Sequence, residues 1–286
     1  MANALFERGR EGFLDGSLDW DTLANSAVLL DLGTASAGNI LIISSTNATP
    51  IVVTTVTHNL SNGDIVSIQG HATNTCANGV WKVAGVTGTT FQLTNPVDGT
   101  NSVGNGVGGA TGSAAVLGGV STVGKFYTDW VASIVGSKVA LGSFTVTDGV
   151  ADAADTTFTA VSGASVEAIA IFQDTGTNGT SRMIAFIDGN HIVTANTLLT
   201  AGTTLLTEPL VAAIPNSTVL PFSSGQSATI NGAPAAGART ITVTSTTVNA
   251  GARAQAPATG SGLPVTPNGG NIIVAWDNGG NRIFKL

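Results

Sequence analysis

The chain has 286 residues, of which only 9% are charged, whereas an ordinary globular domain has roughly 25%. The net charge is −7, and the ten Lys and Arg residues are scattered, so the clustered basic surface that phosphate groups require is missing. This composition argues against a nucleic-acid partner. So little charge also leaves a surface poorly protected against association. We interpret this as evidence that much of the surface is covered in an assembly.

Neither a secretory signal peptide nor a transmembrane helix is expected from the sequence. The first 16 residues are charged and lack the apolar stretch of a secretory signal. No run approaches the ~18 apolar residues that span a bilayer, so we expect no membrane partner. Cys76 is the single cysteine, which excludes an intramolecular disulfide. We therefore expect the protein to fold in a cytoplasm.

The N-terminal region predicts a short helix and one buried strand. The helix is expected over 3–15, capped by Asn3 and ended by Asp15-Gly16, with Leu5, Phe6, Phe13 and Leu14 near one stripe. The strand is expected over 27–32.

Residues 38–118 predict a separate all-β module. Short strands are expected at 51–56, 65–69, 80–83 and 90–93, with a turn at 62–64. Glycine dominates residues 99–119, which we expect to form a loop or an extended arm.

The next segment returns to longer apolar runs. It predicts one or two helical turns over 126–135 and strands at 138–146, 156–161, 168–172 and 183–187, with 175–180 as a hairpin loop.

Residues 191–258 differ in composition from the preceding segment and are rich in Thr, Ala, Leu and Pro. A faint internal repeat relates 201–222 to 236–254, which predicts repeated short β-units of the kind that form arms or stalks. Beyond them, apolar runs at 271–276 and 282–286 flank Asn278-Gly279. Because Asn-Gly is the strongest short-range hairpin signal, we expect a C-terminal hairpin across this turn.

The two blocks 145–187 and 262–286 both consist of short apolar runs joined by Gly/Asn turns, although about 75 residues of different composition separate them. A sheet whose pieces are separated in sequence indicates an insertion. We therefore predict a mainly β fold: a discontinuous β-sandwich-like frame domain with a short N-terminal helix and two inserted small β modules. The frame comprises 1–39, 118–190 and 260–286, and the inserts are an all-β module at 40–117 and a β-repeat arm at 191–259.

Three carboxylates, Asp148, Asp152 and Asp155, lie three to four residues apart. Oxygen ligands of this kind suit Ca²⁺, but the spacing is not that of an EF-hand loop and no bidentate Glu follows. Asp residues in Gly/Ala-rich turns more often cap their own backbone. We predict no metal site and no cofactor.

The remaining candidates for chemistry are also weak. The stretch GNGVGG at 104–109 lacks the preceding strand and following helix of a phosphate-binding loop. His58, His71 and His191 have no second ligand at metal spacing, and Cys76 has no basic neighbour to stabilise a thiolate. No catalytic motif is present. We predict that the protein is not an enzyme and that it has no catalytic residues.

The four tryptophans, Trp20, Trp81, Trp130 and Trp276, are interpreted as core anchors rather than as sugar-stacking platforms. Trp81 is the exception, since its alternation with Val80 and Val83 points it outward.

Three resemblances carry the functional hypothesis. The frame, through MANALFERGREGFLDGSLDWD, VTDGVADAADTTFTAVSG, IFQDTGTNGTSRMIAFID and LPVTPNGGNIIVAWDNGGNRIFKL, resembles a family of small tailed-phage virion structural proteins over nearly half the chain. The first insert, through THNLSNGDIVSIQG, ANGVWKV and TTFQL, is similar to a phage β-module that resembles the first catalytic-cysteine half-domain of ubiquitin-activating enzymes. The second, through TEPLVAAIPNSTVLPF and AAGARTITVTS, resembles the β-repeats of phage head-decoration and fibre proteins.

These resemblances imply a virion structural protein that assembles in a host cytoplasm and supplies no catalytic residues. The expected role is that of a capsid cement or decoration protein, a homotrimer that binds the major capsid protein and bridges its subunits. Two alternatives remain open: a tail or baseplate component, and a carbohydrate-binding adhesin.

Overall fold

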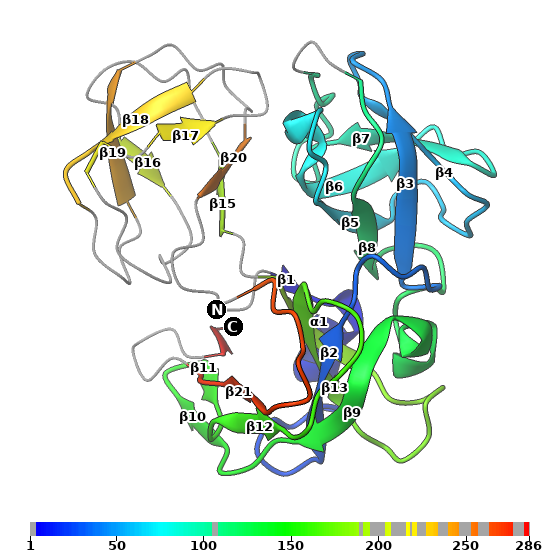
Figure 1. Cartoon of the computed structure of the whole chain (residues 1–286), viewed down its shortest axis with the longest axis vertical. Coiled ribbons are helices and arrows are strands. Elements are labelled where there is room, and N and C mark those ends of the chain that lie inside the picture. Colours follow the sequence, from blue (N-terminus) through cyan, green and yellow to red (C-terminus); the bar gives the residue numbers. More distant parts are fainter. Residues whose placement is uncertain are drawn as a thin grey trace. The chain divides into compact units, whose positions relative to one another are not determined.

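The structure, a computed structural model, is mainly β (Figure 1). It describes residues 4–104, 108–188, 191–194, 204–206, 216–217, 219–221, 227–233, 240–245, 253–256, 263–276 and 283–285. The chain divides into two compact units. One consists of Met1–Asn39, Ala115–Gly189 and Ser261–Leu286, and we call it the frame; the other consists of Ile40–Ala114, the barrel module, together with Asn190–Gly260.

The frame is built on a five-stranded antiparallel sheet in the order β1-β14-β13-β2-β9. Its strands are β1 (Ala4–Leu5), β2 (Asn25–Leu30), β9 (Ile134–Ala140), β13 (Ala168–Gln173) and β14 (Met183–Ile187). All residues of β2 and β14 are buried. Near-continuous apolar runs of this kind fit a sheet that is covered on both faces. The predicted strands at 27–32, 168–172 and 183–187 are confirmed.

Helix α1 (Glu7–Asp15) covers the β14 side of this sheet. Gly9 permits the close approach, because a Cβ at this position would lie 2.8 Å from the Cα of Ile184. The helix ends at Gly16, which adopts the left-handed conformation (φ 71°) as the sequence predicts. Two expectations were wrong. The helix begins after Phe6 rather than at Asn3, because residues 4–5 pair with β14, and Leu14 is 89% exposed.

Small sheets form the second layer of the frame. They contain β10 (Thr145–Thr147), β11 (Val150–Asp152), β12 (Thr156–Phe158), β21 (Ile272–Val274) and β22 (Phe284–Lys285). β11 pairs with β10 and β22, and β12 pairs with β21. The two 3-10 helices η2 (Tyr127–Asp129) and η3 (Val131–Ser133) fit the predicted helical turns. The single strand predicted over 138–146 was wrong: β9 ends at Ala140, and Ser143 (φ 53°) bends the chain before β10.

The predicted C-terminal hairpin was also wrong. β21 pairs with β12 and β22 pairs with β11, so the two C-terminal strands belong to different sheets. The intervening residues 277–282, including Asn278-Gly279, lie outside the described residues. Pairing with 150–158 buries Trp276 and Phe284 in the frame, and this burial outweighs the local preference for a hairpin.

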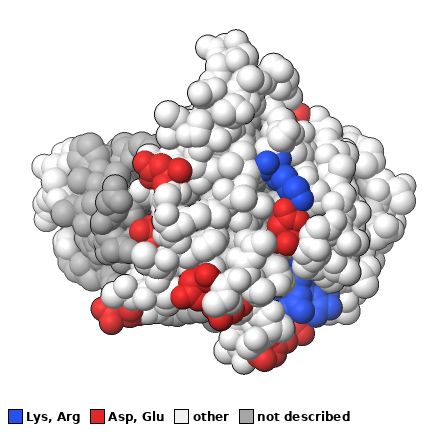
Figure 2. Space-filling view, turned by 90° about the horizontal axis from the view of Figure 1, so that it is seen from below, with Lys and Arg blue, Asp and Glu red and all other residues white. Residues whose placement is uncertain are grey.

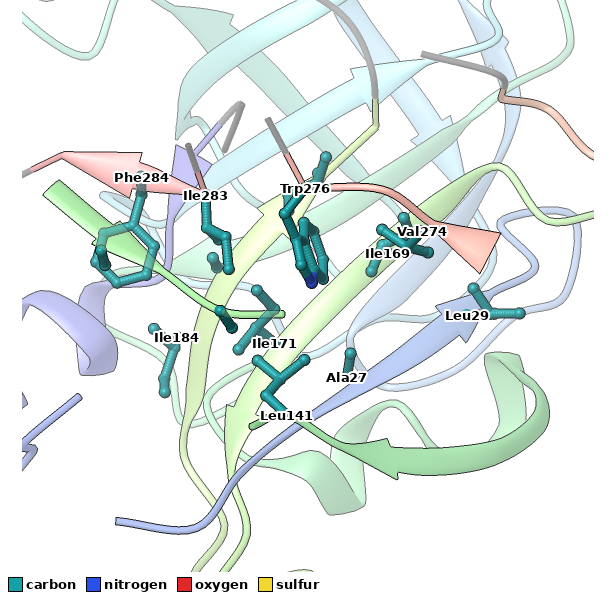
Figure 3. Close-up of a cluster of buried hydrophobic side chains, with 14 of the residues drawn as sticks. Ala27, Leu29, Leu141, Ile169, Ile171, Ile184, Val274, Trp276, Ile283 and Phe284 are labelled. Atoms are coloured by element: carbon teal, nitrogen blue, oxygen red, sulfur yellow. The ribbon is translucent and has the colours of Figure 1, made fainter. Parts of the chain in front are cut away.

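The main core of the frame lies between the five-stranded sheet and these small sheets. Figure 3 shows Val274, Trp276, Ile283 and Phe284 of the C-terminal segment packed with side chains of β2, β13 and β14. Trp276 Nε1 donates to Thr156 Oγ1 at 3.0 Å, and its backbone N–H donates to Asp155 Oδ1 at 3.0 Å. Residues more than a hundred positions apart thus complete one core.

Aromatic side chains lie beside the frame strands as well. Phe6 contacts the rings of Trp130 and Phe186 with centroids 5.6 and 6.2 Å apart. Tyr127 lies 4.4 Å from Phe172. Trp130 is fully buried and approaches Gly38 so closely that a Cβ there would lie 2.4 Å from its indole ring.

The barrel module is a closed six-stranded barrel in the order β3-β4-β7-β6-β5-β8. Its elements are β3 (Asn39–Ser45), β4 (Val52–Thr55), β5 (Ile65–Gln69), η1 (Thr75–Ala77), β6 (Gly79–Ala84), β7 (Thr90–Thr94) and β8 (Ser113–Gly118). The four predicted strands are confirmed. The predicted loop or arm at 99–119 was wrong at its C-terminal end, because β8 is fully buried. Its small residues, Ser, Ala and Gly, concealed a strand that closes the barrel.

The segment Asn190–Gly260 contains six short strands in its described parts: β15 (His191–Thr194), β16 (Thr204–Leu206), β17 (Val219–Pro221), β18 (Ser227–Asn231), β19 (Thr240–Ser245) and β20 (Arg253–Ala256). β15 pairs with β20, and the other four form a sheet in the order β16-β19-β18-β17. Ile230, Ile241 and Val243 are buried between them. The β character predicted for this segment is confirmed.

Candidate functional site: an uncharged barrel wall

The residues considered as metal ligands lie in turns and layer contacts of the frame. Asp148 and Gly149, with φ of 52° and 75°, form the two-residue turn between β10 and β11. Asp155 accepts the Trp276 N–H, and the carbonyl of Asp152 accepts Trp20 Nε1 at 2.9 Å. Within the described ranges, no three His, Cys, Asp or Glu side chains gather closely enough to hold a metal ion. The arrangement of these residues connects the layers of the frame.

The Gly-rich stretch packs on the barrel's own backbone. Gly109 and Ser45 exchange backbone hydrogen bonds, at 2.6 and 3.3 Å, and a Cβ at Gly108 would lie 2.7 Å from the Ser45 carbonyl oxygen. The next regular element is strand β8 rather than a helix, so the N–H groups that a phosphate loop supplies at a helix N-terminus are not assembled here. Residues 105–107 lie outside the described residues.

The histidines and the cysteine are not brought together as a reactive group. His58 Nδ1 accepts the N–H of Leu60 at 3.2 Å, and its ring lies 5.6 Å from that of Phe91. His71 and Cys76 are each 1% exposed. Burial lowers the pKa of both His58 and His71, so both are neutral at pH 7. The side chain of His191 lies outside the described residues.

All four tryptophans are buried, at 3% exposure or less, which confirms their interpretation as core anchors. The outward placement expected for Trp81 was wrong. Trp81 lies inside the barrel, where Nε1 donates to the Ala77 carbonyl at 2.7 Å. Its neighbours Val80 and Lys82 carry the outward positions of β6.

The most distinctive surface is an uncharged face of the barrel, which we call the barrel wall. It comprises the outward residues of three adjacent strands, namely Leu41, Ile43, Ser44, Val52, Thr54, Thr90 and Gln92, together with Val56 directly after β4. Pairing places Ser44 beside Thr54, Thr54 beside Thr90, and Val52 beside Gln92. Ile43 occupies the bulge in β3 and is 50% exposed, and Val56 is 52% exposed.

The wall is neutral because the barrel module has almost no charged residues. Residues 40–114 contain three charged side chains, Asp64, Lys82 and Asp98. Asp64 is buried and accepts the N–H of Ser61, and Asp98 accepts the N–H and the hydroxyl of Thr100. Lys82 alone borders the wall, on β6 beside Thr94. The wall is therefore a surface where Coulomb forces contribute little.

The frame carries charge in small separate groups, as Figure 2 shows for one face. Lys138 Nζ lies 2.6 Å from Asp174 Oδ2, and Arg8 lies 2.5 Å from Glu11. Burial raises the pKa of Asp174, but the hydrogen bonds from Lys138 and the Gly176 N–H outweigh it, so the net pKa is lowered. A hydrogen bond from Asp21 lowers the pKa of the exposed Asp19, while the same bond raises the pKa of Asp21. These groups are local pairs rather than a charged binding field.

Comparisons with known proteins assign no relatives. No protein-family model matches the chain, and no curated protein matches it. In the part of the chain that the structure describes, no helix combines the length and apolarity needed to cross a bilayer. The sequence predicted two of the three strands that carry the barrel wall, β4 and β7, but neither β3 nor the wall itself. The signal that could have found it is the alternation of Val52, Thr54 and Val56 with buried Val53 and Thr55.

Proposed function

We propose that this protein is a phage virion structural protein, a capsid cement or decoration protein that stabilises the head by bridging capsid subunits. The observation that carries the proposal is the barrel wall, a neutral surface with Ile43 and Val56 half exposed. The buried centres of protein interfaces are depleted in charged residues in the same way. Exposed apolar surface rimmed by polar residues is typical of protein interaction sites.

The mechanism is mechanical. A protein that binds only the assembled lattice lowers the free energy of that state and so raises the cost of separating its subunits. The proposed partners are the major capsid protein and further copies of this chain, with a homotrimer as the expected form. The resemblance of the frame to virion structural proteins supports the same role.

Two features support a structural role over catalysis. Of the carboxylates that the sequence singles out, Asp155 accepts the Trp276 N–H, and Asp148 lies in a two-residue turn. The buried tryptophans are not available as a sugar-stacking platform, so the adhesin alternative has less support than an interface with protein.

The test compares particles that lack this chain with complete particles. We expect depleted particles to assemble but to release DNA at lower temperature or on osmotic shock. Purified protein should restore them even in about molar NaCl, because salt screens Coulomb terms and not apolar burial. If depleted heads are as robust as complete ones while host adsorption fails, the cement role is wrong and the tail or adhesin alternative replaces it.

Single substitutions test whether the wall is responsible for restoring the depleted particles. Ile43→Lys and Val56→Lys place a charge on the wall and should abolish restoration while leaving the fold intact, because both side chains are half exposed. Leu14→Lys is the matched control: Leu14 is 89% exposed on α1, beside Glu11 and Asp15, and should restore particles normally. Full restoration by both wall variants would remove the wall from the proposal.

A further inference from the structure

One end of the barrel is closed by three segments, 44–47, 71–78 and 108–112, which we call the His71 end. The Asn78 side-chain amide binds both the N–H and the carbonyl of His71, each at 3.0 Å. Asn74 Nδ2 donates to Ser45 Oγ at 3.2 Å and to the Thr46 carbonyl at 2.9 Å. The N–H of Ala72 donates to Thr111 Oγ1 at 3.1 Å. The three segments therefore depend on one another.

The imidazole of His71 lies inside this closure. The residue is 1% exposed, and across the described part of the chain neither Nδ1 nor Nε2 has a hydrogen-bond partner. The backbone of Gly109 packs directly against the ring, since a Cβ there would lie 3.0 Å from His71 Cε1 and 1.4 Å from Thr73 Oγ1. Little space remains at this point for water to enter without movement of the 108–112 segment.

The three segments place no carboxylate beside His71 that could balance the positive charge of a protonated ring. The described parts of the three segments carry no Asp, Glu, Lys or Arg, and their single other titratable group is the buried thiol of Cys76. Asp64 and Lys82 lie at the opposite end of β5, where Ile65 pairs with Lys82. Asp98 lies on the loop after β7 and is bound to Thr100. An imidazolium at His71 would be a buried charge without a counter-charge, which is strongly unfavourable.

We propose that protonation of His71 opens the His71 end, so that the barrel module loosens in mild acid while the frame remains folded. This pH-dependent opening does not depend on the virion role. It requires that the ring be buried, lack acceptors and be packed under the Gly-rich segment, and each of these is a property of the structure. The frame segments 1–39, 115–189 and 261–286 contain no histidine, so they lack a group of this kind.

The direction of the pH dependence follows from burial. Burial alone lowers the pKa of His71 below its ordinary value of 6.5, so the closed end binds fewer protons than the opened end. The closed state is therefore fully stable above pH 6.5 and loses stability as pH falls below it. The opening equilibrium should rise by up to about tenfold per pH unit until the pKa of the closed state is reached.

Hydrogen exchange on the full chain between pH 7.5 and 5.0, corrected for the intrinsic rate, tests the proposal. We expect amides of 71–78 and 109–112 to lose protection by up to about tenfold per pH unit, while those of β2 and β13 hold theirs. His71→Phe keeps a buried ring that cannot be protonated and should abolish this loss. His58→Gln is the matched control, because His58 lies near the Asp64 end of the barrel, and it should retain the loss at 71–78.

Two results would overturn the proposal: protection at 71–78 that does not change with pH in the wild-type chain, or an unchanged loss in His71→Phe. If His71→Phe does not fold, NMR titration of the His71 ring in the wild-type chain decides. A ring that titrates below pH 6.5, together with exchange broadening at 108–112, supports this opening. A ring that titrates at or above 6.5 contradicts it.

Discussion

The frame and the barrel module make their cores in opposite ways. The frame assembles its core from segments that begin near residue 18 and end near residue 284, whereas one continuous segment, 39–118, forms the barrel. The frame carries 21 of the chain's 27 charged residues and the barrel module carries three. A closed barrel has no edge strand that could recruit another chain, so its wall can lack charge without becoming a template for aggregation. The open frame sheet has edges, and Lys138 lies on the edge strand β9.

Under the proposed function, folding and contact with partners are assigned to separate parts of the chain. The frame depends on its C-terminal segment, and the barrel does not. The barrel can therefore present an uncharged surface on a fold that closes on itself. Substitutions and deletions in each unit test this separation.

The largest effect is expected from a matched pair of tryptophan truncations. Trp276→Ala removes a ring from the frame core, and Trp81→Ala removes one from the barrel interior. Each should cost its own unit ~3–5 kcal/mol, as measured by denaturant unfolding, with hydrogen exchange locating the loss. Leu14→Ala is the exposed control and should change stability by less than ~0.5 kcal/mol. If Trp276→Ala behaved like wild type, the 272–285 strands would not be part of the core.

A smaller effect is expected at the carboxylate that binds Trp276. Asp155→Ala leaves the Trp276 N–H without its acceptor, which should cost ~1–3 kcal/mol, whereas Asp148→Asn keeps a residue that tolerates the left-handed turn. The melting temperature should be the same with and without EDTA, because Asp155 binds the Trp276 N–H and Asp148 forms a turn. A fall of several degrees in EDTA would restore the metal interpretation of Asp148, Asp152 and Asp155.

The Lys138–Asp174 pair should have a modest, pH-dependent effect. Asp174→Asn should cost ~0.2–1 kcal/mol at pH 7. The pKa of Asp174 is lowered from 3.8 in the folded protein, so its contribution is present above pH 3.8 and is lost as pH falls through the lower folded value. The melting temperatures of Asp174→Asn and wild type should therefore converge in strong acid. A difference that stays constant from pH 7 to pH 2 would contradict the ion-pair account.

Removing the whole barrel should also have only a small effect on the frame. Residues 38 and 116 are adjacent, since the Val116 N–H donates to the Gly38 carbonyl at 2.8 Å, so the barrel enters and leaves the frame at one place. Replacing 40–114 by a short Gly linker should leave a frame that unfolds cooperatively, with a change on the order of 1 kcal/mol from loop closure. Loss of cooperative unfolding would show that the frame needs the barrel.

Local sequence predicts some strands of both units and fails where a strand depends on distant contacts. Local alternation was sufficient for 65–69 and 183–187, which match β5 and β14. It failed for β8, because Ser113–Gly118 follows a Gly-rich stretch and shows no polar–apolar alternation, as all six residues are buried when the barrel closes. It failed again at 271–286, where a strong local turn signal competed with burial of Trp276 against residues some 120 positions away.

The candidate surface was harder to predict than the fold. Sequence showed that the chain has little charge, but which apolar residues face outward depends on register. The bulge in β3 places both Ile43 and Ser44 on the outer face, and Trp81, expected outside, lies inside. Sequence presents His71 only as a candidate metal ligand or catalytic group, because the burial of its ring follows from the closure of three separate segments.

The copy number of this chain per purified particle distinguishes a head cement protein from a tail component. Quantitative mass spectrometry against the major capsid protein measures it without any assumption about mechanism. We expect hundreds of copies, because a cement protein must occupy the repeated sites of the head lattice. Tens of copies or fewer would assign the protein to the tail, and its absence from the particle would contradict the virion role.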